Sequence, residues 1–291
     1  MRRLNIILLS LGTACLLFSC QNSIKNETGD SSRVQVDTLR IVSLNGTISE
    51  ILSELGLEDK IVGTDVASTY PESLNSKPKV GHNKKIPVEG VMALNPNLII
   101  GTKQEINEET IEQFKQAGIR LVLLDQDYSV DGTKKLIRNV SDSLKLTHKG
   151  DSIIKTFDKA MATVSRYSAE TKKPKVLFIY ARGAGTMMVG GTGTQVDKII
   201  ELAGGVNAAK DFPDYKPLTA ESLVAYNPDV LLFFTSGLTS LGNEDGLLNI
   251  QGVKETNAGK NKKIVAMDGQ LLSGFSSRLP NAIEELHSKI Y

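Results

Sequence analysis

Residues Thr147–Glu170 read THKGDSIIKTFDKAMATVSRYSAE, and they decide how the rest of the chain is interpreted. Apolar side chains recur there every three or four positions, which is the spacing of one stripe along an α-helix. At 1.5 Å per residue, a helix of about 20 residues is roughly 30 Å long. Pro174 marks the point by which this helix must end. The stripe consists of Ile153, Ile154, Phe157, Ala160, Met161, Val164 and Tyr167.

The segments on either side of this predicted helix resemble each other. Residues Glu89–Ile100 read EGVMALNPNLII and residues Glu221–Leu232 read ESLVAYNPDVLL, with Glu, Ala, Asn and Pro repeated 132 positions apart. Each copy predicts a short helix, an Asn-Pro turn and a buried strand. Such a turn is also common by itself, so the repeat alone does not establish two lobes. Together with the central helix, it predicts an α/β fold of two similar lobes with parallel-sheet cores, joined by one long rigid α-helix.

Apolar runs bounded by turn residues predict the elements of each lobe. In the first lobe we expect strands at Leu39–Leu44, Ile61–Gly63, Leu98–Ile100 and Leu121–Leu124, and helices at Ile48–Leu55, Val88–Leu94, Asn107–Ala117 and Val130–Leu144. In the second lobe we expect strands at Lys175–Tyr180, Met187–Val189, Val230–Phe234 and Ile264–Met267, and helices at Thr194–Ala203, Thr219–Ala225 and Arg278–Lys289.

The first twenty residues have the pattern of a targeting segment. Arg2 and Arg3 precede a mostly apolar run that is too short for a membrane span. The run ends in LFSC (Leu17–Cys20), which resembles a bacterial lipobox, where the signal is cut before a Cys that is then lipidated. A plain secretory signal with an incidental Cys is the alternative. The expected parts are a signal peptide (1–19), a flexible tether (20–38), an N-terminal lobe (39–146), the interlobe helix (147–170) and a C-terminal lobe (171–291).

The composition narrows the classes of function. The formal net charge is +1 and aromatic residues make up 5% of the chain, which argues against a nucleic-acid partner. Cys15 would leave with the signal peptide, so the mature chain would keep Cys20 alone and could form no intrachain disulfide. An exported chain of this kind must be stabilised by its apolar core.

Motifs typical of catalysis are missing from the sequence. Its three histidines, His82, His148 and His287, are far apart and form no close-spaced metal-binding pair. The Gly-rich run Arg182–Gly193 lacks the register of a phosphate-binding loop, but it could line a cleft where backbone approaches a ligand. We therefore expect a binding protein without a catalytic cofactor, and not an enzyme. An exported enzyme on a two-lobe scaffold is the less favoured alternative.

Tyr70 is the candidate ligand-binding residue that the loops single out. It lies in DVASTYP (Asp65–Pro71), just after a predicted strand. In parallel α/β sheets, loops at the carboxyl ends of strands line the ligand crevice. Tyrosine is a known ligand of haem iron. A loop tyrosine is more often half-buried packing, so the residues alone leave both interpretations open.

From about Arg40 to its C-terminus, the chain resembles the substrate-binding proteins of bacterial ABC importers. It is similar to the class with two lobes joined by one long helix, which binds cobalamin, siderophores or haem, and most of all to periplasmic haem-binding proteins. The resemblance lies in RIVSLNGTISEILSELG (Arg40–Gly56), STYP (Ser68–Pro71), LFIYARGAGTMMVGGTGTQVDKIIELAGGVNA (Leu177–Ala208), YKPLTAE (Tyr215–Glu221) and LLSGFSSRLP (Leu271–Pro280). It implies that ferric haem b is the transported ligand, held in the cleft between the lobes.

The resemblance also implies roles for individual residues. Tyr70 would bind the haem iron through its phenolate, and Arg182 in the facing loop would stabilise that anion. His82 would be a possible second iron ligand. Cationic side chains would bind the haem propionates, with Arg278, Lys216, Lys84 and Lys85 as candidates. Phe275, Met187 and Met188 would supply apolar walls.

Proteins of this family dock on a transmembrane permease dimer that works with a cytoplasmic ATPase. They do so with one Glu on each lobe, and Glu50 (in TISEIL) and Glu221 (in LTAESL) match those positions. Both also suit the positive ends of their predicted helices. The resemblance implies an exported lipoprotein, periplasmic or on the cell surface, anchored in a membrane through Cys20. A cobalamin or ferric-siderophore carrier is the alternative within the class.

Overall fold

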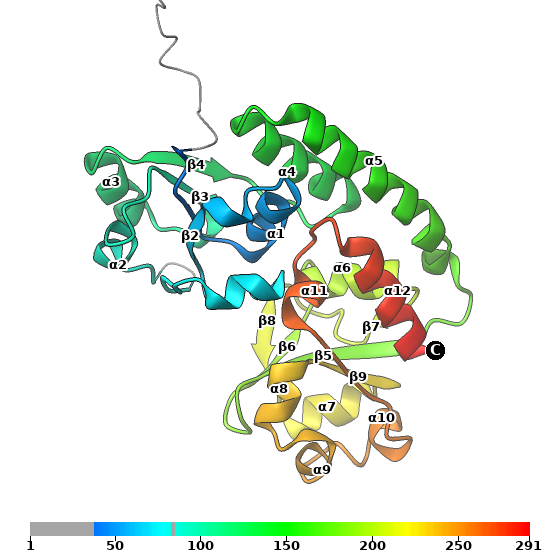
Figure 1. Cartoon of the computed structure of the whole chain (residues 1–291). Helices are drawn as coiled ribbons and strands as arrows, with labels where there is room; N and C mark the ends of the chain where they lie inside the picture. The colour runs from blue at the N-terminus through cyan, green and yellow to red at the C-terminus, as the bar shows by residue number, and fades with distance from the viewer. Residues whose placement is uncertain (1–37, 83–84) are drawn as a thin grey trace, which may run out of the picture. The chain divides into compact units, whose positions relative to one another are not determined.

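The computed structural model describes residues 38–82 and 85–291. They form an α/β fold of two lobes, coloured blue to green and green to red in Figure 1. The predicted signal peptide, nearly all of the predicted tether with Cys20, and Lys84 lie outside the described residues.

The N-terminal lobe is built on a four-stranded parallel sheet in the order β2-β1-β3-β4. Buried apolar clusters cover both faces of the sheet. Side chains of α1 and α4 belong to one cluster, and side chains of α2 and α3 belong to the other. The elements are β1 (Ile41–Ser43), α1 (Gly46–Glu54), β2 (Ile61–Thr64), α2 (Val88–Met92), β3 (Leu98–Thr102), α3 (Glu108–Gln116), β4 (Arg120–Leu124) and α4 (Val130–Ser143).

The C-terminal lobe has a sheet in the order β10-β9-β5-β6-β8, with the short β7 also pairing with β5. Strands β10, β9 and β5 form the predicted parallel core of this sheet. Strand β6 runs antiparallel to both of its neighbours, β5 and β8, so the sheet as a whole is mixed. The reason is the loop Arg182–Thr186 between β5 and β6, which is too short for the crossover that parallel neighbours need. The strands are β5 (Lys175–Ala181), β6 (Met187–Gly190), β7 (Val206–Asn207), β8 (Tyr215–Pro217), β9 (Val230–Phe234) and β10 (Ile264–Met267).

Seven helices lie on the two faces of this sheet in the part of the chain that the structure describes. Helices α6, α11 and α12 contribute to one buried cluster, and α7 to α10 contribute to the other. The helices are α6 (Gln195–Leu202), α7 (Ala220–Tyr226), α8 (Thr235–Ser240), α9 (Asn243–Leu247), α10 (Asn257–Lys260), α11 (Gly269–Ser273) and α12 (Leu279–Ile290).

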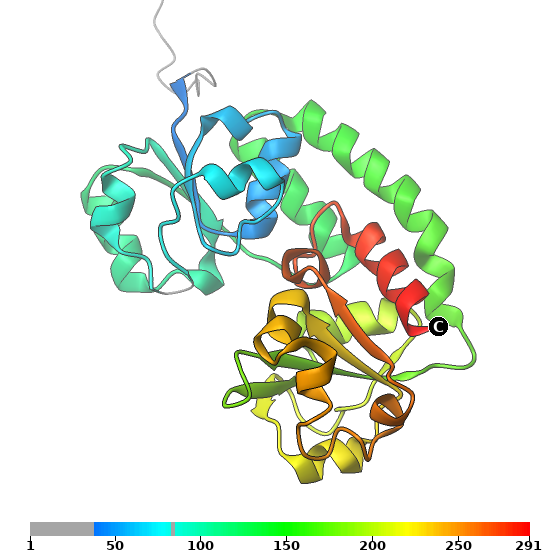
Figure 2. The same ribbon diagram turned by 60° about the horizontal axis from the view of Figure 1, so that its bottom comes forward.

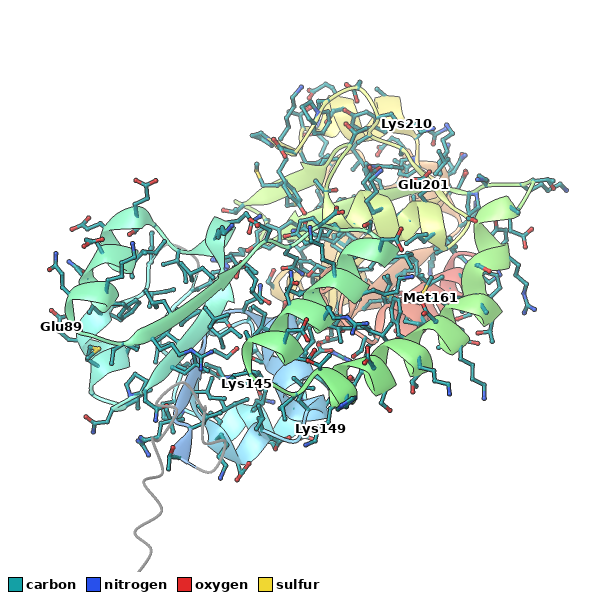
Figure 3. The ribbon with its side chains drawn as sticks, turned by 90° about the horizontal axis from the view of Figure 1, so that it is seen from above. Glu89, Lys145, Lys149, Met161, Glu201 and Lys210 are labelled. Atoms are coloured by element: carbon teal, nitrogen blue, oxygen red, sulfur yellow. The ribbon has the colours of Figure 1, made fainter. Side chains whose placement is uncertain are left out.

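Helix α5 (Thr147–Val164) is the predicted central helix, and a 3₁₀ turn at Ser165–Ala169 continues it. Its apolar stripe is divided between the lobes. Ile153 and Ile154 pack against the N-terminal cluster, whereas Phe157, Met161 and Val164 are buried in the C-terminal cluster. Helix α5 therefore packs on both α4 and α12, as Figures 2 and 3 show from two directions. Burial of each such side chain contributes about 1.5–3 kcal/mol, which ties both lobes to the helix.

The two Asn-Pro turns of the repeat share an unusual backbone conformation. Asn95 lies three residues after the end of α2 with φ 46°, and Asn227 is the C-cap of α7 with φ 40°. Both lie in the left-handed region that Asn tolerates better than most residues. Strands β3 and β9 then start at Leu98 and Val230, again 132 positions apart. The repeat is thus one supersecondary unit present in both lobes.

Candidate ligand-binding site

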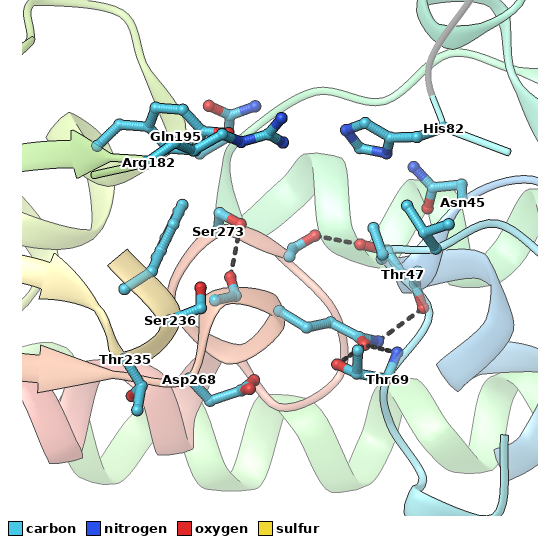
Figure 4. A pocket seen from close by; sticks show the side chains of 18 of the residues that line it. Asn45, Thr47, Thr69, His82, Arg182, Gln195, Thr235, Ser236, Asp268 and Ser273 are labelled. Atoms are coloured by element: carbon cyan, nitrogen blue, oxygen red, sulfur yellow. Dashed lines mark hydrogen bonds between the residues drawn. The ribbon is translucent and has the colours of Figure 1, made fainter. Parts of the chain in front are cut away.

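A cavity of about 1160 Å³ has walls from both lobes. Ligand pockets for drug-sized molecules measure about 300–1,000 Å³, so this cavity suits a larger ligand. Figure 4 shows its side chains from close by. The N-terminal lobe contributes Asn45, Gly46, Thr47, Val66, Ala67, Thr69, His82, Glu105, Gln126 and Tyr128. The C-terminal lobe contributes Tyr180, Ala181, Arg182, Gln195, Phe234, Thr235, Ser236, Thr239, Ser240, Asp268, Gly269, Gln270, Ser273 and Gly274.

The loop Asp65–Tyr70 forms part of the N-terminal wall and directly follows β2. Two interactions fix its conformation. The ammonium of Lys79 donates to the carbonyl of Ser68 at 2.6 Å and to Oγ1 of Thr64 at 3.0 Å. The buried carboxyl of Asp65 accepts from Oγ of Ser68 at 2.5 Å. Burial raises the pKa of Asp65, and the hydrogen bond from Ser68 opposes that rise.

His82 brings an imidazole to the same wall. The amide of Val66 donates to the carbonyl of Gly81 at 2.9 Å, which places the His82 segment beside the Asp65–Tyr70 loop. Gly81 has φ 117°, and a Cβ there would come within 2.6 Å of the Lys85 carbonyl oxygen, so only glycine fits. In Figure 4 the imidazole of His82 and the side chain of Arg182 reach into the cavity toward each other.

Arg182 projects from the C-terminal wall, in the short loop after β5. Its amide donates to the carbonyl of Thr186, and the amide of Gly183 donates to Oγ of Ser240 at 2.8 Å, so the loop is anchored on α8. The guanidinium carbon lies 5.5 Å from the ring centre of Tyr180. Among the described residues Arg182 forms no ion pair, and its charge therefore remains available to a ligand.

Three aromatic side chains, Tyr128, Tyr180 and Phe234, give the cavity apolar surface. Tyr180 and Phe234 meet edge to face with ring centres 6.1 Å apart. Burial raises the pKa of Tyr128, while a hydrogen bond with Gln195 opposes the rise. Tyr128 and Gln195 come from opposite lobes, and both line the cavity.

The carboxylates of the cavity are occupied by contacts within the protein. Glu105 accepts from Nδ2 of Asn45 at 2.8 Å and from Oγ1 of Thr102 at 3.0 Å. Burial raises the pKa of Glu105, and these two bonds oppose the rise. Asp268 caps α11 by accepting from the amide of Leu271 at 2.8 Å. A ligand thus meets an imidazole, an unpaired guanidinium, aromatic faces and many hydroxyl groups.

Tyr70 lies beside this cavity and does not line it. The residue is 43% exposed, and its ring faces Arg278, whose guanidinium carbon is 3.5 Å from the ring centre. Only its neighbour Thr69 reaches the cavity wall. The loop turns at this point, so its backbone borders the cavity while the phenol faces the other lobe, and iron ligation by Tyr70 stays a prediction.

Glu50 is buried in an ion pair with Arg278. Its side chain is 1% exposed and accepts from Nε of Arg278 at 2.9 Å and from Nη2 at 2.6 Å. The docking role of Glu50 and the propionate-binding role of Arg278 stay predictions, and in this structure the two side chains are paired with each other. Glu221 is exposed in the first turn of α7, where its docking role stays a prediction.

The remaining candidates lie outside the cavity wall. Phe275 is 1% exposed in the core, with its ring centre 5.6 Å from that of Tyr128, so it packs behind the wall. Met187 and Met188 lie on β6, and Met187 packs against the core cluster of the C-terminal lobe. The ammonium of Lys216 lies 4.4 Å from the ring centre of Phe212. Lys85 is exposed, and none of these five is among the residues that line the cavity.

Sequence reasoning missed several residues of the cavity. Gln126 and Tyr128 follow β4, and Asp268 and Gln270 follow β10. The rule that singled out Tyr70, that loops after parallel strands line the crevice, would have found all four if it had been applied to every predicted strand.

A sequence profile of the periplasmic binding protein family matches residues 41–271. The chain belongs to this family. The periplasmic haem-binding protein RhuT from Roseiflexus sp. RS-1, in its apo form, superimposes with a TM-score of 0.83 and 37% identity, over 87% of this chain and 98% of that one. The periplasmic haem-binding protein BhuT, solved with two haems, gives a TM-score of 0.82 and 31% identity, over 87% and 97%.

Curated relatives of this periplasmic binding protein include an ABC transporter substrate-binding lipoprotein and vitamin B12-binding proteins. An uncharacterised ABC transporter substrate-binding lipoprotein, YvrC of Bacillus subtilis, is 26% identical over 92% of this chain and 85% of its own length. A vitamin B12-binding protein of Vibrio parahaemolyticus is 25% identical over 85% of this chain and 87% of its own length. These relatives and structural neighbours are substrate-binding proteins of the predicted class.

Two features of the described residues bear on chemistry and location. No cluster of three or more His, Cys, Asp or Glu side chains in this part of the chain could hold a metal ion. None of its helices has both the length and the apolar character that crossing a membrane requires.

Proposed function

We propose that this protein captures haem outside the cytoplasm and delivers it to an ABC importer. One observation carries the proposal: His82 of one lobe and Arg182 of the other reach into the same large cavity. Haem iron is commonly held by a histidine imidazole, and a guanidinium suits the carboxylates at the porphyrin edge. We propose His82 as an iron ligand, and the iron-binding role expected of Tyr70 stays a prediction.

The cavity walls agree with a porphyrin ligand. Tyr128, Tyr180 and Phe234 offer flat apolar faces that can stack on a macrocycle. Two structural neighbours above 30% identity are haem-binding proteins by their titles, which favours the same cargo here.

Cobalamin is the second candidate, because curated relatives are vitamin B12-binding proteins. The corrin ring of cobalamin carries amide side chains in place of the propionates of haem. An unpaired guanidinium therefore favours haem over cobalamin, since arginine binds carboxylates better than amides. A ferric siderophore would not require the imidazole.

A titration distinguishes these cargoes. The full-length protein in detergent is titrated with hemin, cobalamin and a ferric siderophore, and binding is followed by absorbance. We expect hemin to saturate at the lowest concentration and to show the spectrum of a histidine-ligated ferric haem. Cobalamin binding without hemin binding would overturn the proposal.

Permease docking is proposed for Glu89 and Glu221. These two residues occupy equivalent positions in the two copies of the internal repeat. Glu89 is exposed in the first turn of α2, and Glu221 is exposed in the first turn of α7. Figure 3 shows Glu89 at the outer end of its lobe. Glu89 is proposed because a docking carboxylate must reach its partner, and the docking role expected of the buried Glu50 stays a prediction.

The amino-terminal part of the proposal concerns residues outside the described range. We propose the boundaries expected above: a signal peptide over 1–19, a lipid anchor at Cys20, a tether to residue 38, lobes over 39–146 and 171–291, and an interlobe helix over 147–170. The sequence LFSC and the lipoprotein name of the Bacillus subtilis relative support the anchor. Cys20→Ser should move the protein from the membrane fraction to the soluble fraction, and unchanged fractionation would contradict the anchor.

A further inference from the structure

The segment Asp268–Arg278 crosses from the C-terminal lobe onto the N-terminal lobe. It begins with helix α11 and leads into α12. Its carbonyls accept hydrogen bonds from N-terminal side chains: Gly274 from Thr47 at 2.5 Å and Phe275 from Thr133 at 3.0 Å. This segment is therefore fastened to both lobes on one side of the ligand cavity.

Gln270 makes the densest set of these contacts. Its Oε1 accepts from the amide of Thr69 at 2.6 Å, from Oγ1 of Thr69 at 2.9 Å and from the amide of Tyr70 at 2.9 Å. Its Nε2 donates to the carbonyl of Gly46 at 3.0 Å and to Oε1 of Glu50 at 2.6 Å. A Cβ on Gly46 would lie 3.2 Å from Cδ of Gln270, so the glycine makes room for this approach.

Glu50 and Arg278 determine which way the amide of Gln270 points. Glu50 is buried, and both of its carboxylate oxygens accept hydrogen bonds from the Arg278 guanidinium. The NH₂ end of Gln270 must face this carboxylate, and its oxygen must then face the amides of Thr69 and Tyr70. Charge-assisted hydrogen bonds of this kind are stronger than neutral ones, which favours a single arrangement.

We propose that Gln270 is a positioning residue for the ligand site, a role that rests on the proposed function. Gln270 belongs to the C-terminal lobe, yet it holds the Asp65–Tyr70 loop, whose Val66, Ala67 and Thr69 form the N-terminal cavity wall. The wall of one lobe is thus held by the other lobe. Ligand residence time depends on this contact, because the ligand leaves when the two walls separate.

The test uses the full-length protein with Gln270→Ala and with Gln270→Met, which keeps the side-chain volume but cannot make the hydrogen bonds. Gln251→Ala, an exposed Gln of the same lobe, is the matched control. Amide hydrogen exchange is measured first, without ligand. We expect the amides of Thr69 and Tyr70 to exchange about tenfold faster in both Gln270 variants than in the wild type. In the control variant, their exchange rates should equal those of the wild type.

The second readout is the rate at which bound hemin transfers to apomyoglobin. We expect this rate to rise about tenfold in the Gln270 variants. Faster exchange with an unchanged transfer rate would show that Gln270 only stabilises the fold, and it would overturn the positioning role. Unchanged exchange would also overturn it. If the wild-type protein binds cobalamin and not hemin, the proposed cargo fails, and cobalamin dissociation replaces hemin transfer as the second readout.

Discussion

The guanidinium carbon of Arg278 lies 3.5 Å from the ring centre of Tyr70, a residue of the opposite lobe. The same guanidinium is paired with the buried carboxylate of Glu50. A cation over an aromatic face contributes about 0.5–2 kcal/mol, depending on how well water is excluded. The contact therefore holds the Tyr70 ring beside the cavity wall, whereas the His82 side chain lines the cavity itself.

His82→Ala should weaken hemin binding by at least about tenfold, which corresponds to about 1.4 kcal/mol, because the iron loses its proposed axial donor. The histidine-type absorbance of the bound haem should disappear as well. Tyr70→Phe is the matched control: it keeps the ring beneath Arg278 and should leave the spectrum and affinity unchanged. A spectrum that is lost in Tyr70→Phe and retained in His82→Ala would identify Tyr70 as the iron ligand and contradict the role proposed for His82.

Glu50→Gln should lower the free energy of unfolding by about 3 kcal/mol, because it leaves the mostly buried Arg278 without its counter-ion. Urea denaturation measures the change. The exposed pair between Lys103 and Asp125 provides the control, since Asp125→Asn should cost at most about 1 kcal/mol. Equal effects of the two substitutions would mean that the buried pair contributes no more than a surface pair.

Glu105 should make the stability of the protein depend on pH. Burial raises the pKa of Glu105 in the folded protein. The folded state thus binds the proton of Glu105 more tightly than the unfolded chain does. The stabilisation that comes from this proton is complete below the unfolded pKa of about 4.3, and it is lost as the pH rises through the folded pKa. Glu105→Gln should therefore gain stability relative to wild type between about pH 4 and pH 7. Urea titrations across this range give the difference, and a constant difference would argue against the raised pKa.

Charge reversal at Glu89 and Glu221 should reduce hemin uptake by cells that depend on the importer. Both carboxylates are exposed and lie outside the cavity, so hemin affinity of the purified double variant should equal that of wild type. Glu201→Lys, at an exposed position of α6, is the control for a general effect of added charge. Normal uptake by the double variant would exclude these residues from docking.

The central helix and the repeat could be predicted because their signals are local. The α5 stripe and the Asn-Pro turns depend only on spacing within about twenty residues, and the structure confirms both. The predicted long strands and helices agree with the structure to within a few residues. Helices α8 to α11 have four to six residues each, too few for a helical period to show.

The site was harder to predict because it depends on contacts between distant residues. Glu50 and Arg278 are 228 positions apart, and a Glu early in a helix has the same local sequence whether it is solvated or paired. Tyr70 and His82 both lie in loops beside β2, and only the fold decides which side chain enters the cavity. The direction of β6 likewise follows from its pairing, which its own three or four residues do not encode.

The exposed residues Thr171–Lys173 between the 3₁₀ turn and β5 are where the polypeptide passes into the C-terminal lobe. Proteases cut such exposed connections most readily. A cut there would sever the backbone but leave α5 packed on α12 and the polar contacts of Gln270 and Arg278 in place. The nicked protein should therefore migrate as two fragments in denaturing gels and elute as one particle on size exclusion, so that the gene could be split at this point into two chains that reassemble.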